Sequence, residues 1–302
     1  MIKTVTVKNY LGEELTIDLS NPSSSGFAVD SITGLGPGKA NINTTEVATN
    51  DGAVYNSSRL DSRNIVIKII FFGTNIEELR QKSYKYFPTK KKLSLTFITD
   101  KRAATIEGYV ESNEPNIFSK SEDTQISIIC PDPYFYSIGD AGQNTVFYGI
   151  DPLFEFSFSN ESLTEKLIEF GSINAVTDAN VFYDGDSEVG VTITLHAMGP
   201  ATGIGIYNTG TRESMLINTD KVASITGGPI VAGDDIIICT VKGRKSARLL
   251  RAGEYFNILN ALDRGAKWFQ LAKGDNVFAY TAESGIINLQ FRVQNDTLYE
   301  GI

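Results

Sequence analysis

Cysteine and histidine are scarce in this chain of 302 residues. It contains two cysteines, Cys130 and Cys239, and a single histidine, His196. Two cysteines are too few for a disulfide framework, and one histidine cannot complete the usual four-ligand zinc site with them. The sequence therefore predicts neither a disulfide-rich scaffold nor a metal centre.

Long apolar runs are also missing. No stretch approaches the ~20 residues of a membrane span. The opening "MIKTVTVKNYLG" alternates polar and apolar residues, which is not the pattern of a signal peptide. We therefore expect a soluble protein made in the cytoplasm, with no membrane partner. A hydrophobic content of 41% supports an ordered core, and the length suits two domains.

Positive charge is sparse as well. The chain has 27 Lys and Arg against 36 Asp and Glu, and residues 139–302 carry almost all of the net charge of −9. Without a basic stripe, the chain is a poor candidate for sequence-specific nucleic-acid binding. The one basic cluster, "KGRKSARLLR" at 242–251, is interpreted as a hairpin turn that could pair with an acidic neighbouring subunit.

Catalytic and cofactor motifs are absent or incomplete. "GLGPGKA" at 34–40 has Thr33 where a phosphate-binding loop needs glycine, and Ala40 follows its lysine. "GIGIYNTG" at 203–210 has no helix after it, and the acidic run 183–190 lacks EF-hand spacing. No nucleophile motif accompanies His196. We expect neither an enzyme nor a cofactor. The sequence leaves open one alternative, a pair of glycosidase carboxylates that lie far apart in the chain.

What the sequence does contain is period-two alternation, which predicts strands with one buried face. In the first half the expected inward residues are Val5, Val7, Ile65, Ile67, Ile69, Leu93, Leu95, Phe97, Ile126, Ile128 and Cys130. One segment, "GTNIEELRQKSYKYFP", predicts a helix with a capping box at Thr74 and Glu77 and an end at Pro88.

The second half alternates in the same way. The expected inward residues are Phe154, Phe156, Phe158, Val191, Ile193, Leu195, Ile287, Leu289, Phe291 and Val293, and "TEKLIEFG" suggests a short helical turn. The same alternation places His196 on a polar face. The chain is thus expected to be mainly β, with one helix packed on a mainly antiparallel sheet in the first half and a β-sandwich or jelly roll in the second half.

A long polar stretch between Lys39 and Asn64 predicts a protruding β-hairpin arm. An Asp-Gly pair at its centre favours a tight turn. The residues expected in the arm are Thr45, Val47, Asn50, Asp51, Gly52, Val54 and Tyr55. A mobile surface loop is the alternative interpretation.

"CPDPYFYS", residues 130–137, predicts the exit from the first domain. Neither Pro131 nor Pro133 can continue a central strand, and each pushes the residue before it, Cys130 or Asp132, into extended geometry. The aromatic run that starts at Tyr134 is suited to an interface between domains. We expect two domains, 1–138 and 139–302, joined by this stiff exit.

Three segments resemble the distal tail proteins of long-tailed bacteriophages, the siphovirus tail component family. They are "VDSITGLGPGKANI" with "DGAVYNSSRLDSRNIVIKI", "LTFITDKRAATIEGYVES" with "ISIICPDPYFYS", and the closing stretch "AKWFQLAKGDNVFAYTAESGIINLQFRVQNDTLYEGI". Together they cover most of the chain, and the motifs are structural rather than catalytic.

The resemblance implies a fold and a role. The first domain would be an N-terminal β-sandwich with one packed helix. It would form a hexameric ring that continues the tail tube and docks the tail-tip or baseplate hub, with subunit contacts on Thr45 to Tyr55. The second would be a galectin-like sandwich that faces outward and carries receptor-binding proteins. The protein would then belong to the virion tail tip. The competing hypothesis is a carbohydrate-binding module that uses Trp268 for host adhesion.

Overall fold

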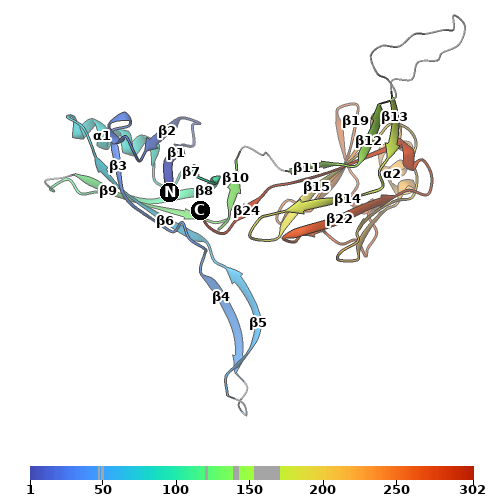
Figure 1. Ribbon diagram of the computed structural model, residues 1–302, viewed down its shortest axis with the longest axis horizontal. Coiled ribbons are helices and arrows are strands. Elements are labelled where there is room, and N and C mark those ends of the chain that lie inside the picture. The colour runs from blue at the N-terminus through green and yellow to red at the C-terminus, as the bar shows by residue number, and fades with distance from the viewer. Residues whose placement is uncertain (47, 49–50, 120–121, 139–142, 153–170) are drawn as a thin grey trace, which may run out of the picture. The chain divides into compact units, whose positions relative to one another are not determined.

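The computed structural model describes residues 1–46, 48, 51–119, 122–138, 143–152 and 171–302 (Figure 1). The strand expected at Phe154, Phe156 and Phe158 and the helical turn expected within 164–170 lie outside the described residues. The chain divides into two compact units, Met1–Ala141 with Leu298–Ile302, and Gly142–Thr297. The C-terminal residues therefore differ from the expected division, because they pack with the first unit.

The main sheet of the first unit is antiparallel, with the strand order β2-β1-β7-β8-β9-β6-β3. Its strands are β1 (Ile2–Lys8), β2 (Glu14–Asp18), β3 (Phe27–Thr33), β6 (Arg63–Phe71), β7 (Lys92–Thr99), β8 (Ala103–Pro115) and β9 (Asp123–Cys130). A short 3-10 helix, η1 (Pro22–Ser24), lies between β2 and β3. Two more strands, β10 (Phe135–Ser137) and β24 (Leu298–Tyr299), lie beside this path.

Alternation along these strands builds the core of the first unit. All of the inward residues expected from the sequence in β1, β6, β7 and β9 are buried. Burying each Val, Ile, Leu or Phe side chain contributes roughly 1.5–3 kcal/mol relative to leaving it in water. The period-two prediction is confirmed for these four strands, and their opposite faces carry mostly polar side chains.

Strand β8 is long enough to pair differently at its two ends. Residues 103–109 pair with β7, whereas residues 109–115 pair with β9, with a register shift between Val110 and Ser112. At the first end, Ala104 and Thr105 also pair with β10, which in turn pairs with β24. The bulge redirects β8, so one strand serves two parts of the sheet.

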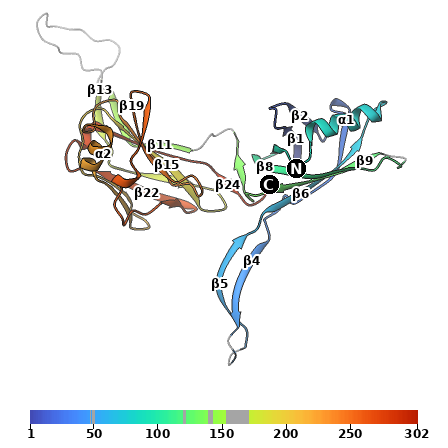
Figure 2. The ribbon, with the colours of Figure 1, turned by 180° about the vertical axis from the view of Figure 1, so that it is seen from behind.

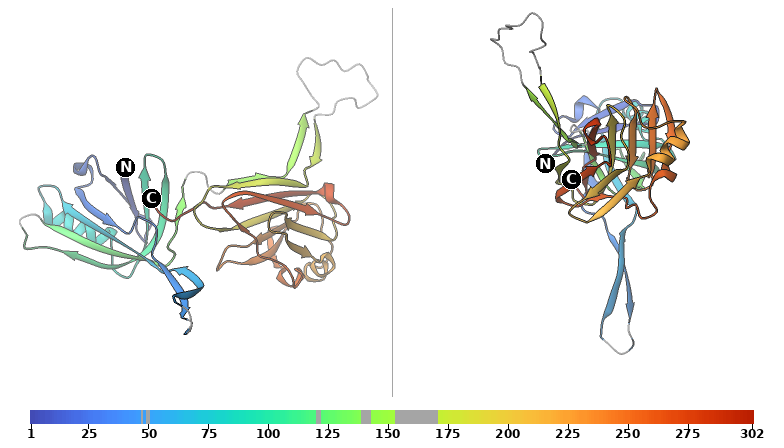
Figure 3. Two further views of the ribbon diagram at one scale, coloured as in Figure 1. Left: turned by 60° about the horizontal axis from the view of Figure 1, so that its bottom comes forward. Right: turned by 90° about the vertical axis from the view of Figure 1, so that its right-hand side faces the viewer.

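Helix α1 (Ile76–Tyr86) packs against this core through Ile76, Leu79 and Tyr86. The left-hand view of Figure 3 shows it against the strands of the first unit. The helix begins one residue later than expected, because the Asn75 side chain, not Thr74, accepts the hydrogen bond from the backbone N–H of Glu78. It ends at Phe87, next to Pro88, as the sequence predicts.

The second unit contains two larger antiparallel sheets. The first has the order β11-β23-β15-β18-β19-β20, with β21 (Gln270–Leu271) beside β15. Its strands are β11 (Gln143–Val146), β15 (Val189–Ala197), β18 (Asp235–Cys239), β19 (Ser246–Arg251), β20 (Glu254–Asn257) and β23 (Leu289–Asn295). The second, β14-β22-β16-β17, is built from β14 (Asp178–Tyr183), β16 (Ile204–Asn208), β17 (Glu213–Ile217) and β22 (Gly274–Thr281).

Shorter elements complete the second unit. They are the strand pair β12 (Tyr148–Pro152) and β13 (Gly171–Ala175), helix α2 (Thr219–Thr226) and the 3-10 helices η2 (Leu259–Ala261) and η3 (Ile286–Asn288). Helix α2 begins at Asn218, whose side chain accepts from the backbone N–H of Lys221, and it ends at Gly227 in the left-handed conformation.

The two larger sheets of the second unit pack face to face through aromatic side chains. Tyr280 of β22 stacks on Phe291 of β23 with ring centroids 5.1 Å apart, and Phe291 also meets Phe147 edge-on. The Tyr280 hydroxyl donates to the backbone carbonyl of Leu289. These contacts close a sandwich core, so the expected mainly β fold is confirmed. Ile287 departs from the expectation: it lies in η3 and is 62% exposed.

Candidate assembly site: the arm and its root

The predicted arm is a two-stranded hairpin, β4 (Ala40–Glu46) and β5 (Ala53–Leu60), whose strands pair only with each other among the described residues. Figures 1 and 2 show it leaving the first unit at the end of β6. Every residue of β4 is exposed, and β5 is exposed up to Arg59. A two-stranded hairpin without a core is marginally stable by itself in water, so this geometry suits a surface that another chain covers.

The arm residues singled out from the sequence lie around its outer half. Thr45 pairs with Val54 in the ladder, and Asn56 donates to the Thr45 hydroxyl at 2.6 Å. Val54 is 56% and Tyr55 61% exposed. Val47 and Asn50 lie outside the described residues.

The connection between the arm strands is longer than expected. The last pair of the ladder is Glu46 with Ala53, so residues 47–52 join the strands in place of the tight turn expected at Asp51-Gly52. Gly52 does adopt a positive φ of 88°. The Asp-Gly signal identified the backbone conformation but not the length of the loop, since a positive φ is equally useful in longer hairpin connections.

Arg63 lies at the root of the arm, three residues after β5. Its Nη1 donates to the carbonyl oxygens of Gly34 and Gly36, just before the arm, at 2.6 and 2.5 Å. Its Nε donates to the carbonyl of Pro133, and its Nη2 to that of Glu300, both at 2.7 Å. One guanidinium thus binds the start of the arm, the end of the first domain's sheet and the C-terminal segment.

The surroundings of Arg63 are dry and mostly neutral. Its residue exposure is 5%, and its guanidinium carbon lies 4.7 Å from the centre of the Phe135 ring. Burial lowers the pKa of the Arg63 guanidinium from its usual value. The planar group has five N–H donors in a fixed fork, and carbonyl oxygens from three segments accept from it, so its placement determines how these segments meet.

The loop that precedes the arm needs glycine. Gly34 has a φ of 84°, and a Cβ atom there would lie 2.1 Å from the backbone oxygen of Asn64. Only glycine accommodates both conditions. The "GLGPGKA" segment is therefore a turn between β3 and β4, and the carbonyl oxygens of Gly34 and Gly36 accept hydrogen bonds from Arg63.

The predicted domain exit forms a compact turn after β9. Cys130 ends β9 and is buried, and burial raises the pKa of its thiol to about 11. After Pro131, the Asp132 carboxylate accepts from the backbone N–H of Tyr134 at 3.2 Å and from the Tyr136 hydroxyl at 2.6 Å. With Pro133 held by Arg63, the turn is fixed on both sides.

Contrary to the expectation for the aromatic run after this turn, Phe135 packs inside the first unit. Phe135 is fully buried in the core of the first unit, edge-on to Phe97 with ring centroids 6.0 Å apart. Tyr136 pairs with Thr105 of β8 and Leu298 of β24. The chain therefore forms one more strand of the first unit before it leaves.

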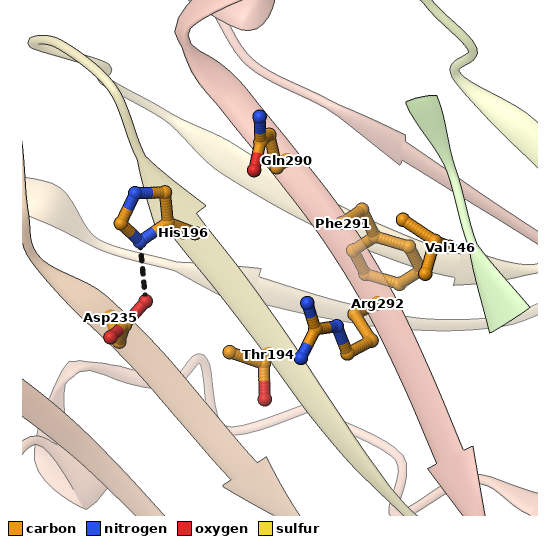
Figure 4. A pocket seen from close by; sticks show the side chains of 7 residues that line it. All are labelled: Val146, Thr194, His196, Asp235, Gln290, Phe291 and Arg292. Carbon is orange, nitrogen blue, oxygen red and sulfur yellow. Dashed lines mark hydrogen bonds and ion pairs between the residues drawn. The ribbon is translucent and has the colours of Figure 1, made fainter. Parts of the chain in front are cut away.

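His196 lies in a shallow polar depression on the outer face of the second unit's larger sheet (Figure 4). It occupies a cross-strand row with Gln290 and Asp235, and its Nδ1 lies 2.7 Å from the Asp235 carboxylate. Thr194 is on the same face, but its hydroxyl points away from the imidazole. The polar face expected for His196 is confirmed. The pair has no hydroxyl nucleophile aligned with it here.

The part of the chain that the structure describes also bears on metal binding and on membrane-spanning helices. No group of three or more His, Cys, Asp or Glu side chains is placed to hold a metal ion there. No described helix combines the length and apolar character needed to cross a bilayer.

The match with a known family decides the identity of the first unit. Residues 12–129 match the family described as phage tail protein RIFT-related domain. These residues belong to that phage tail family. The resemblance to the siphovirus tail component family is thereby confirmed, and the matched range contains the arm, Arg63 and most of β9.

One solved structure extends the likeness in fold beyond the RIFT-related domain. The crystal structure of SPP1 Dit (gp 19.1), described as a paradigm of the hub adsorption apparatus in phages infecting Gram-positive bacteria, matches with a TM-score of 0.64. The identity is 14%, and the match covers 98% of this chain and 99% of that chain, so it shows a common fold. The phage P2 baseplate in its activated conformation with Ca matches at 13% identity and a TM-score of 0.49, over 100% of both chains. No curated protein matches.

Sequence reasoning missed Arg63 as the centre of the arm root. Its position at the head of an alternating strand is visible in "SRNIVIKII", where a charged residue occupies an inward position. A single charged residue at an inward position of an alternating strand indicates a buried side chain whose polar atoms are hydrogen-bonded. Its acceptors, however, come from residues up to Glu300 and have no local pattern.

Proposed function

We propose that this chain is a distal tail protein that forms a hexameric hub ring at the end of a phage tail. The ring would join the tail tube protein to the tail-tip or baseplate hub protein, and the second unit would carry receptor-binding proteins. The observation that carries this proposal is the RIFT-related domain with an exposed, unpartnered arm. The SPP1 Dit fold over the whole chain supports it.

The arm supplies the subunit contact in this proposal. Its two strands expose backbone edges as well as the apolar side chains Ile42, Val54 and Tyr55. Strand pairing with a neighbour would satisfy the edges through main-chain hydrogen bonds, and a ring of identical contacts closes by rotation. Arg63 would hold the arm at one angle, which a closed ring requires.

Shortening the arm tests this role. Replacing residues 41–59 by Asn-Gly closes the hairpin where Ala40 pairs with Leu60. Because all of the removed residues that the structure describes are exposed, the free energy of unfolding should change by no more than about 1 kcal/mol. Ring formation should be lost in native mass spectrometry and negative-stain images.

The matched control is Ile287→Ser, which removes an exposed apolar side chain from the second unit. It should leave the rings intact. Rings of native size formed by the shortened protein would contradict the proposed role of the arm.

The proposed role is structural, without catalysis or a cofactor, and its place is the virion tail tip after synthesis in the host cytoplasm. The exit residues 130–134 would transmit a defined angle between ring and outer domain. His196→Ala should leave tail assembly unchanged, as judged by particle counts and infectivity. A loss of tails from a correctly folded variant would contradict this.

A second candidate is carbohydrate binding by the second unit during host adhesion. The depression of Figure 4 favours it, because imidazole, amide and guanidinium groups from His196, Gln290 and Arg292 line one open surface. Trp268 is less suited than expected, since the Lys245 ammonium lies 5.4 Å from its ring centre. Glycan-array binding that is abolished by Arg292→Ala would support this function.

A further inference from the structure

The outermost strand of the second unit's larger sheet has an open edge. Strand β20 pairs with β19 on one side, and no described strand pairs with the other. Ile258 N–H donates to the Ala247 carbonyl, so Phe256 and Glu254, at alternate positions, face β19. In an antiparallel ladder the residues between them direct their backbone groups outward. The backbone N–H and C=O groups of Tyr255 and Asn257 therefore point away from β19, and no hydrogen bond joins them to a backbone group of another described residue.

A groove with two cations runs beside this edge. It is lined by Lys245, Ser246, Arg248, Tyr255, Asn257 and Leu259, among others. Arg248 is directly opposite Asn257 in the ladder, and Tyr255 is 59% and Leu259 43% exposed. Neither Lys245 nor Arg248 forms an ion pair with a described residue. The groove thus combines uncompensated positive charge with apolar surface.

This positive groove contrasts with the chain as a whole, which carries a net charge of −9. The adjoining turn adds Lys242 and Arg244, both exposed, so the cations gather at one end of β18 and β19. Charge complementarity across an interface increases the rate of association and selects partners. The occupant that best fits such an edge is acidic.

We propose that β20 docks an acidic, extended segment of another polypeptide, which adds to the sheet as its next strand. The open backbone edge specifies a polypeptide, because it offers alternating donors and acceptors at the spacing of a strand. Lys245 and Arg248 would select a segment with acidic side chains, and Tyr255 and Leu259 would contact the apolar side chains of that segment. A second copy of this chain is a poorer fit, since its exposed arm strands contain Glu46 but also Arg59. The docking does not depend on ring formation.

Binding of designed peptides to the full chain tests the proposal. The probe is a fluorescein-labelled, alternating Glu-Val octapeptide, and the comparison peptides are its Lys-Val counterpart and a version N-methylated at alternate residues. Fluorescence anisotropy should show binding of the Glu-Val peptide that weakens with salt. N-methylation of the edge-facing residues should weaken it about 10-fold or more, because the main-chain hydrogen bonds are lost.

Two protein variants locate the site. Lys245→Glu with Arg248→Glu should weaken Glu-Val binding by about 10-fold and favour the Lys-Val peptide. The matched control, Lys242→Glu with Arg244→Glu, makes the same charge change outside the groove lining and should have a smaller effect. Hydrogen exchange of residues 254–257 should slow when the Glu-Val peptide binds.

Three outcomes would overturn the proposal. They are equal binding of the acidic and basic peptides, no effect of N-methylation, and equal losses in the two double variants. A change of oligomeric state in the Lys245→Glu, Arg248→Glu protein, measured by light scattering, would assign the edge to a second copy instead. Rings that persist in that variant would show that this edge and the arm act separately.

Discussion

Arg63 connects three segments that are distant in sequence through a single side chain. Each of its hydrogen bonds goes from the buried guanidinium to a backbone carbonyl oxygen. Hydrogen bonds that involve a charged group contribute more to folding stability than those between neutral groups. Removing the guanidinium would leave these carbonyls without their donor. Residues of this kind affect both stability and the geometry of the arm.

Arg63→Met should destabilise the first unit by roughly 2–5 kcal/mol, because buried acceptors lose a charged donor while side-chain volume is largely kept. Chemical denaturation followed by fluorescence would measure this. Arg59→Met is the control, since Arg59 is 78% exposed and 3.6 Å from Asp61, and its loss should cost less than about 1 kcal/mol. Equal effects of the two variants would show that the Arg63 contacts contribute little.

The two cysteines should differ in reactivity. Burial raises the pKa of Cys130 to about 11, so almost no thiolate is present near pH 8, whereas Cys239 is only partly buried. We expect a thiol reagent to modify Cys239 first, as followed by mass spectrometry. Both should react at similar rates in denaturant. Because the folded pKa of Cys130 exceeds the usual value of 9.0, its contribution to stability should be lost as the pH rises from about 9 towards 11.

At the scale of elements, helix α1 shows how two adjacent residues compete to begin a helix. Thr74 and Asn75 are both good N-caps, and each has a glutamate three residues later. In the structure Asn75 caps the helix, and its side chain also donates to Glu78. Which of the two residues caps the helix depends on the direction in which the chain leaves the preceding strand. The local sequence pattern carries no information on that direction.

Asn75→Ala should therefore lower the free energy of unfolding by about 1 kcal/mol, the usual effect of a lost N-cap. Thr74→Ala should change it by only a few tenths of that amount. Thermal and urea denaturation of the two variants would measure the difference. A larger loss of unfolding free energy for Thr74→Ala than for Asn75→Ala would show that Thr74 caps the helix, as the sequence predicted.

Most strands could be predicted from local alternation, since Val191, Ile193 and Leu195 point inward as their spacing requires. Their partners could not, because pairing such as that of Tyr136 with Leu298 joins residues from opposite ends of the chain. The arm was predictable from its polar composition, whereas its loop length was not. Phe135 was assigned to an interface because aromatic residues suit both interfaces and cores.

At the scale of the whole molecule, the first unit depends on residues from the C-terminal segment. Leu298 and Tyr299 pair with β10, the Ile302 N–H donates to the Leu35 carbonyl, and Glu300 accepts from Arg63. The second unit has its own core. The units should therefore respond differently to truncation.

Deleting residues 298–302 should lower the melting temperature of the first unit by several degrees, because β24 and one Arg63 hydrogen bond are lost. The second unit should melt as before, which calorimetry of the full and truncated chains would show as one shifted and one unshifted transition. The control is Glu300→Ala, which keeps the backbone carbonyl that Arg63 uses. Two unshifted transitions would mean that the C-terminal pairing is dispensable.

The return of the C-terminal strand also orders events during synthesis. Residues 298–302 leave the ribosome after the entire second unit has been translated. The β10–β24 pair and the last acceptor of Arg63 can form only then. The second unit can thus finish folding before the first unit does, and a nascent chain that stops before residue 298 has an arm without its complete root. Residues 298–302 must therefore be translated before the arm root can be completed.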